Sequence, residues 1–190
     1  MDDADAEMFE GLLRSRQYAG FFDWPDRDLA EYGVVESLAK ALEKHGALFF
    51  SDLKIRGRGS DPPDLEAVDA DGQRVAIEVT ELVDGEAIHA HKIGRTSEIA
   101  EWGRQPFLDR VGQLLAKKEA SSQRLMGGPY PGGYVVVLHT DETFLTHPAV
   151  DEYLKGQTFT GLPSINRAFL LLSYTPGKGY PYFELNIQRA

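Results

Sequence analysis

Two acidic residues, Asp64 and Glu78, have the types and the spacing expected of a metal-binding pair. Glu78 lies inside the apolar run of residues 75–79, where burying an uncompensated carboxylate is costly. Residues 69–72, Asp-Ala-Asp-Gly, are typical of a tight turn between two strands. A hairpin over residues 64–80 would bring Asp64 and Glu78 within reach of each other. Because converging carboxylates repel, a divalent cation is the usual remedy.

The elements around this hairpin follow from hydrophobic periodicity and from turn residues. Apolar residues recur at helical spacing between Asp28 and His45, and Gly46 is a natural helix stop. A polar, poorly periodic segment, residues 81–104, follows the hairpin and is interpreted as an irregular excursion. The remaining expected elements are a strand at 47–55, a long helix at 106–126, a strand at 134–140, a short helix at 148–154, and strands at 168–174 and 182–187.

This order predicts an α/β fold with one mixed central sheet flanked by helices. At 190 residues the chain fits a single domain, residues 1–190. Within it we expect an N-terminal arm at 1–27, a core at 28–140, and a C-terminal helix and strands at 141–190.

Composition excludes several classes of protein. The chain has no cysteine, so a disulfide framework, a thiol nucleophile and a cysteine zinc site are excluded. No apolar run is long enough to span a membrane, and the acidic N-terminus lacks the positive region of a secretory signal. We therefore expect a cytoplasmic protein with no membrane partner.

The net charge of −10 argues against broad electrostatic binding of nucleic acid. The charge is uneven, however. Residues 1–36 hold 10 acidic and 3 basic residues, whereas the other residues hold 20 acidic and 17 basic ones. A local basic groove outside the N-terminal region therefore remains open.

The chain resembles the PD-(D/E)xK nuclease superfamily, which has the restriction-endonuclease-like fold. Pro63-Asp64 matches the first half of the motif, and Glu78-Val79-Thr80 stands where the second half is expected. The expected elements from residue 28 to 140 follow the αβββαβ core of that superfamily. The resemblance implies that Asp64, Glu78 and the carbonyl of Val79 ligate Mg²⁺, for which Mn²⁺ can substitute. Hard oxygen ligands suit such a cation.

The chain departs from the motif at its third position, because Thr80 replaces the lysine. Within the superfamily this lysine can migrate to the following helix, which here offers Lys117 and Lys118. Lys118 follows Leu114 and Leu115 by four and three positions, so it falls on the apolar face, where an unpaired lysine is unusual. Lys118 is therefore the first candidate. An ammonium within about 4–6 Å of the Glu78 carboxylate would support catalysis.

Lys117 is the second candidate for that charge, and it lies further round the helix toward solvent. Lys92 in the polar segment is a further source of charge, and Gln113 could position water. The resemblance also implies an acidic residue on the helix before the hairpin. Glu36 is the first choice for that role and Glu31 the weaker one.

The loop before Asp64 carries Arg56 and Arg58 on a glycine-rich frame. These arginines could contact a phosphate backbone, although a solvated loop is an equal alternative. The resemblance then implies an Mg²⁺-dependent nuclease that hydrolyses phosphodiester bonds of nucleic acid, with a DNA endonuclease favoured. The small size suggests that cutting a duplex needs a homodimer or a targeting partner protein.

The alternative function is a catalytically inactive domain of the same fold that binds protein or nucleic acid. The missing motif lysine and the net charge favour this alternative, whereas retention of both carboxylates favours the enzyme.

Overall fold

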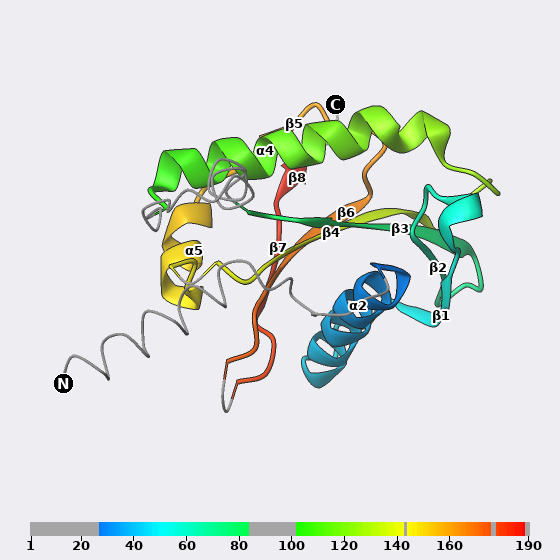
Figure 1. Cartoon of the computed structure of the whole chain (residues 1–190), viewed down its shortest axis with the longest axis horizontal. Coiled ribbons are helices and arrows are strands. Elements are labelled where there is room, and N and C mark those ends of the chain that lie inside the picture. Colours follow the sequence, from blue (N-terminus) through cyan, green and yellow to red (C-terminus); the bar gives the residue numbers. More distant parts are fainter. Residues whose placement is uncertain (1–26, 84–101, 143, 176–177, 189–190) are drawn as a thin grey trace, which may run out of the picture.

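The protein is mixed α/β, with helices on both faces of a central sheet (Figure 1). A computed structural model describes residues 27–83, 102–142, 144–175 and 178–188. In chain order the elements are α2 (Arg27–Lys44), β1 (Phe50–Ile55), η1 (Arg58–Ser60), β2 (Leu65–Asp69), β3 (Arg74–Glu81), α4 (Arg104–Ser121), η2 (Ser122–Arg124), β4 (Gly133–Thr140), α5 (His147–Leu154), β5 (Phe159–Thr160), β6 (Arg167–Leu172), β7 (Tyr182–Glu184) and β8 (Ile187–Gln188). None of the described helices is long and apolar enough to cross a membrane.

The main sheet has the strand order β1-β2-β3-β4-β6-β7. Strands β1, β2 and β3 form an antiparallel meander, whereas β3, β4 and β6 run parallel. Strand β7 returns antiparallel to β6, and β5 pairs with β8 in a separate small sheet. Helix α4 provides the crossover that a parallel pair such as β3 and β4 requires.

The two faces of the sheet carry separate apolar clusters, because side chains alternate along each strand. Residues 75, 77 and 79 of β3 pack with α2, and the main helix residues on that side are Val34, Val35, Leu38 and Leu42. Ala76 of β3 belongs to the opposite cluster, to which α4 contributes Phe107, Leu108, Val111, Leu114 and Leu115. Glu78 shares the parity of Ala76, so its side chain points toward α4.

The hairpin predicted over residues 64–80 is confirmed. The Asp69 carboxylate accepts hydrogen bonds from the backbone N–H groups of Asp71 and Gln73 at 3.0 and 2.8 Å, which holds the turn. Gly72 adopts a φ of 74°, a conformation that glycine reaches without strain. Leu65 pairs with Ile77, so Asp64 stands beside the part of β3 that carries Glu78.

The remaining expectations fit in part. The helix over 28–45 and the strand over 134–140 match α2 and β4 to within a residue or so. The long helix ends at Ser121, and η2 follows it, rather than continuing to 126. The final expected strand, 182–187, is divided between β7 and β8 in different sheets, and β5 was not expected. Residues 1–26 and the segment 84–101, with Lys92, lie outside the described residues.

Candidate active site

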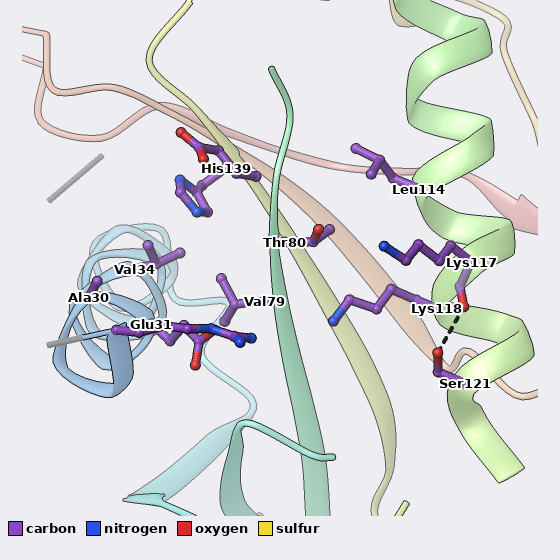
Figure 2. Close-up of a pocket in the computed structure, with 12 residues that line it drawn as sticks. Ala30, Glu31, Val34, Val79, Thr80, Leu114, Lys117, Lys118, Ser121 and His139 are labelled. Carbon is purple, nitrogen blue, oxygen red and sulfur yellow. Dashed lines mark hydrogen bonds and ion pairs between the residues drawn. The ribbon is translucent and has the colours of Figure 1, made fainter. Parts of the chain in front are cut away.

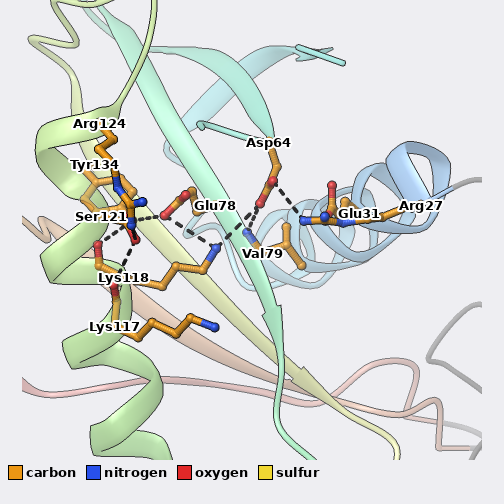
Figure 3. Close-up of polar contacts among 10 residues, drawn as sticks. All are labelled: Arg27, Glu31, Asp64, Glu78, Val79, Lys117, Lys118, Ser121, Arg124 and Tyr134. Atoms are coloured by element: carbon orange, nitrogen blue, oxygen red, sulfur yellow. Dashed lines mark hydrogen bonds and ion pairs between the residues drawn. The ribbon is translucent and has the colours of Figure 1, made fainter. Parts of the chain in front are cut away.

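Asp64, Glu78 and Lys118 meet at one point between β3 and α4 (Figure 3). The Lys118 Nζ lies 3.5 Å from Glu78 Oε2 and 4.0 Å from Asp64 Oδ2. The Asp64 and Glu78 side chains are only 2% and 4% exposed, and that of Lys118 is 15% exposed. The ammonium therefore bridges two buried carboxylates, which compensates charge that would otherwise be costly to bury.

Each side chain reaches this point because of its place in its element. Glu78 faces α4 through the alternation of β3, and Lys118 extends the apolar face of α4 by one turn beyond Leu114 and Leu115. Asp64 stands just before β2, where its Oδ2 accepts a 2.7 Å hydrogen bond from the Val79 N–H. The N–H and C=O of one strand residue point to the same side, so the Val79 carbonyl faces this edge too.

Tyr134 is the fourth member of the site, and the sequence analysis missed it. Its hydroxyl donates a hydrogen bond to Glu78 Oε2 and lies 3.3 Å from the Lys118 carbonyl. Burial, followed by the neighbouring Glu78 charge, raises the pKa of Tyr134, so the hydroxyl stays protonated as a donor. The sequence signal was a tyrosine hydroxyl at the start of the apolar run of residues 134–138, and its partner could be identified only once β4 was paired with β3.

Arg27, at the start of α2, was also missed, because the sequence analysis placed it in the N-terminal arm. Its guanidinium lies 3.7 Å from Asp64 Oδ1 and donates a 2.7 Å hydrogen bond to Glu31 (Figure 3). Burial raises the pKa of Glu31 despite the neighbouring arginine. Arg27 thus links Asp64 to an acidic residue of α2.

The acidic residue of α2 that faces the site is Glu31. Glu36, the first choice from the sequence, lies away from the site. The Glu31 side chain is 14% exposed and lines the cavity, whereas that of Glu36 is 46% exposed and pairs with Lys40 at 3.1 Å. At 3.6 residues per turn, position 31 lies close to position 27 on the helix, and position 36 lies about half a turn away. Helical phase, rather than closeness in sequence to the hairpin, decides which acid faces Asp64.

A cavity of about 420 Å³ opens beside these residues (Figure 2). Lys117 and Lys118 enter it from α4, Glu31 lines it from α2, and Thr80 lies on β3 between the two helices. The short side chain of Thr80 leaves the room into which the lysines extend. The cavity is large enough to admit a phosphate group beside the buried carboxylates.

Burial shifts the pKa values of two further groups here. It raises the pKa of Asp64 to about 7, a shift that Lys118 opposes and Glu31 reinforces. It lowers the pKa of His139, which lines the same cavity, to about 4. The His139 imidazole is therefore neutral near pH 7, and Asp64 changes charge in the physiological range.

The donors suit a hard divalent cation of the Mg²⁺ type. Among the described residues no group of three or more His, Cys, Asp or Glu side chains could hold a metal. Two carboxylates and a backbone carbonyl nevertheless remain, and Mg²⁺ commonly uses only one or two carboxylates, completing its shell with water and substrate oxygens. The Asp64, Glu78 and Val79 oxygens are therefore the donors that could hold the ion implied by the resemblance.

Several other predicted residues are not brought to the site. Arg56 directly follows β1, pairs with Glu66 of β2 at 3.1 Å and donates to the Met126 carbonyl, so it links the end of β1 to β2 and to the segment after η2. The side chain of Arg58 lies outside the described part of the protein. Gln113 is exposed on α4 and does not line the cavity.

Comparison with known protein families, with curated proteins and with solved structures finds no match to this chain. The functional argument therefore rests on the residues and geometry of the site.

Proposed function

We propose that this protein is a metal-dependent nuclease that hydrolyses phosphodiester bonds of nucleic acid, with DNA as the favoured substrate. The observation that carries the proposal is the position of Lys118 between Asp64 and Glu78, 4.0 and 3.5 Å from their oxygens. A site with two carboxylates and one ammonium matches the chemical content of the PD-(D/E)xK motif, even though the lysine comes from α4 rather than from position 80.

The arrangement of elements supports the same proposal. A helix, three antiparallel strands, a helix and a parallel strand follow one another from α2 to β4, which is the order of the αβββαβ core. Fold resemblance alone would not identify an activity. Its weight here comes from Asp64 and Glu78, which lie on one hairpin and both contact Lys118 of the following helix.

Asp64, Glu78 and the Val79 carbonyl would hold the ion, Mg²⁺ or Mn²⁺. The bound cation would supply Lewis-acid stabilisation of the negative charge that develops on the phosphate.

The chain's own residues then have distinct tasks. The Lys118 ammonium, already between the carboxylates, orients the attacking water and donates to a phosphate oxygen. Tyr134 holds Glu78 in place through its hydroxyl, and the Val79 N–H holds Asp64. Lys117 and Arg27 line the cavity and offer positive charge to the phosphates on either side. Because only the ionised Asp64 carboxylate would ligate the cation, metal binding should be favoured as Asp64 ionises.

One observation favours a second candidate, an inactive binding domain of the same fold. Lys118 already lies within ion-pair distance of both carboxylates, so the cluster is internally compensated without a cation. A domain that had lost catalysis could keep this cluster for stability alone. The two candidates differ in whether the carboxylates bind a metal.

The test is a cleavage assay on supercoiled plasmid, linear duplex, single-stranded DNA and RNA. Each substrate is incubated with Mg²⁺, Mn²⁺ or EDTA, and Glu78→Gln is compared with Glu36→Gln. The latter removes an equal charge at an exposed position outside the cavity. Metal-dependent cleavage that is lost in Glu78→Gln and kept in Glu36→Gln would support the nuclease.

Absence of cleavage by the wild type, together with absence of Mn²⁺ binding by calorimetry, would overturn it in favour of the binding domain. Cleavage that survives in Glu78→Gln would place the activity elsewhere.

A further inference from the structure

A second cavity, of about 850 Å³, lies between the C-terminal half of α2, the start of α5 and the segment that joins β6 to β7. Its described lining contains three lysines, two histidines and three tyrosines, and no aspartate or glutamate. In a chain with a net charge of −10, this is a local reversal of sign. The first cavity, by contrast, is lined by Glu31 and Glu81 together with Arg27, Lys117 and Lys118, so its charge is mixed.

The positive charge comes from two sides of the cavity. Lys40 and Lys44 project from α2, and Lys178 comes from the β6–β7 connection. All three lysines are exposed, and Lys40 also forms a 3.1 Å ion pair with Glu36. Charges on both sides of a groove attract an anion that lies along it.

Two pairs of aromatic rings line the cavity together with these lysines. Tyr174 is 59% exposed, and its ring meets that of Tyr180 edge-on at 5.5 Å. The His45 Nδ1 lies 3.3 Å from the Tyr182 hydroxyl, and their rings are 5.7 Å apart. An exposed ring held against a second ring, within a cationic groove, presents a surface on which a nucleobase can stack.

Helix α2 connects this groove to the candidate active site. Arg27, Glu31 and Val34 line the first cavity, and Ala41 and Lys44 line the second. At 1.5 Å per residue, Glu31 and Ala41 are about 15 Å apart along the helix axis. That distance corresponds to roughly four stacked nucleotides at 3.4 Å each. One strand could therefore occupy both cavities.

We propose that this groove binds single-stranded nucleic acid, with Tyr174 stacking on a base and Lys44 and Lys178 contacting phosphates. The strand continues along α2 toward Asp64 and Glu78. This continuation rests on the proposed nuclease function, whereas binding in the groove does not.

The test is fluorescence anisotropy in EDTA, so that cleavage cannot interfere, with a labelled 12-residue oligothymidylate as probe. Tyr174→Ala should weaken binding about fivefold or more, because stacking of one base contributes that much. Tyr174→Phe should keep binding within about twofold, since the ring remains. Lys44→Ala should weaken binding several-fold. Lys54→Ala is the matched control, because it removes an exposed lysine on β1 outside the groove.

Competitors separate the possible ligands. An abasic strand of equal length should compete at least fivefold less well than the oligothymidylate. Equal competition by the abasic strand, by heparin or by an acidic peptide would overturn stacking. If free thymidine monophosphate competes as well as the oligomer at the same concentration, the groove binds mononucleotides and the proposal of a bound strand is wrong.

The two proposals fail separately. Wild-type cleavage combined with unchanged binding by Tyr174→Ala would reject the groove and leave the nuclease. Binding that depends on Tyr174, with no substrate cut under any metal, would keep the groove and reject the nuclease.

Discussion

Lys118 is the central residue of the candidate site, because its ammonium lies between the two buried carboxylates of Asp64 and Glu78. Its neighbour Lys117 lines the same cavity from the same helix but is exposed and has no such ion pair among the described contacts. The two lysines therefore form a natural matched pair. They differ in burial and contact, and not in charge or element.

We expect Lys118→Met to lower the rate of cleavage about 100-fold or more, because loss of one donor to a developing charge typically costs that much. Methionine keeps the length and the apolar stem of lysine. Single-turnover rates on the best substrate measure the effect. Lys117→Met should cost less than about tenfold, and an equal loss in both variants would contradict the assignment.

Tyr134 positions the Glu78 carboxylate, so its hydroxyl should affect how tightly the site binds a metal ion. We expect Tyr134→Phe to weaken Mn²⁺ binding about tenfold, the lower end of what loss of a ligand's hydrogen-bond partner costs. Isothermal titration calorimetry measures this without reference to activity. Tyr153→Phe is the control, since the Tyr153 hydroxyl donates to the Trp102 carbonyl instead. Unchanged Mn²⁺ affinity in Tyr134→Phe would show that Glu78 is not a metal ligand held by this tyrosine.

At the scale of elements, the sequence predicted what local pattern determines. The hairpin carried its own turn residues, and Lys118 could be placed on the apolar face of its helix by counting positions. The contact of Tyr134 with Glu78 could not be predicted, because it depends on the register of two parallel strands joined by a long crossover. Glu36 was preferred wrongly because no sequence signal showed that Arg27, at the start of α2, contacts Asp64. Without that contact, the face of α2 that points toward the site could not be predicted.

Three acids gather where β3 and β4 end, and they make the folded state sensitive to pH. Burial, reinforced by the neighbouring charges of Glu81 and Glu142, raises the pKa of Asp141 to about 7. The folded chain thus holds this proton more tightly than the unfolded chain, in which an aspartate titrates near 3.9. The free energy of unfolding contributed by Asp141 therefore falls as pH rises from about 4 to about 7.

We expect Asp141→Asn to be more stable than the wild type at pH 7.5, by on the order of 1–2 kcal/mol after allowing for solvent screening. At pH 4 this advantage should vanish, because the wild-type carboxyl is then protonated. Urea unfolding at several pH values measures the difference. Asp151→Asn removes an exposed carboxylate of α5 and controls for the loss of one charge. An advantage that does not depend on pH would contradict the explanation.

For the whole molecule, a net charge of −10 means that nucleic acid can be attracted only by a local field. The described basic residues of the two cavities could supply it, and they come from α2, from α4 and from the β6–β7 connection. A strand bound along this path would neutralise few of its phosphates. The affinity should then depend on salt far less than that of a broadly basic nucleic-acid-binding protein.

This expectation can be put in numbers. Each phosphate neutralised on a single strand contributes about −0.7 to the slope of log K against log salt concentration, so phosphate contacts by Lys44 and Lys178 predict a slope of about −1.4. Anisotropy titrations in EDTA between 50 and 200 mM salt measure the slope. Lys44→Ala should make it less steep by about 0.7, and Lys54→Ala should leave it unchanged. A wild-type slope of about −5 or steeper would require many more phosphate contacts than the described residues of this groove provide, and the path along α2 would then be wrong.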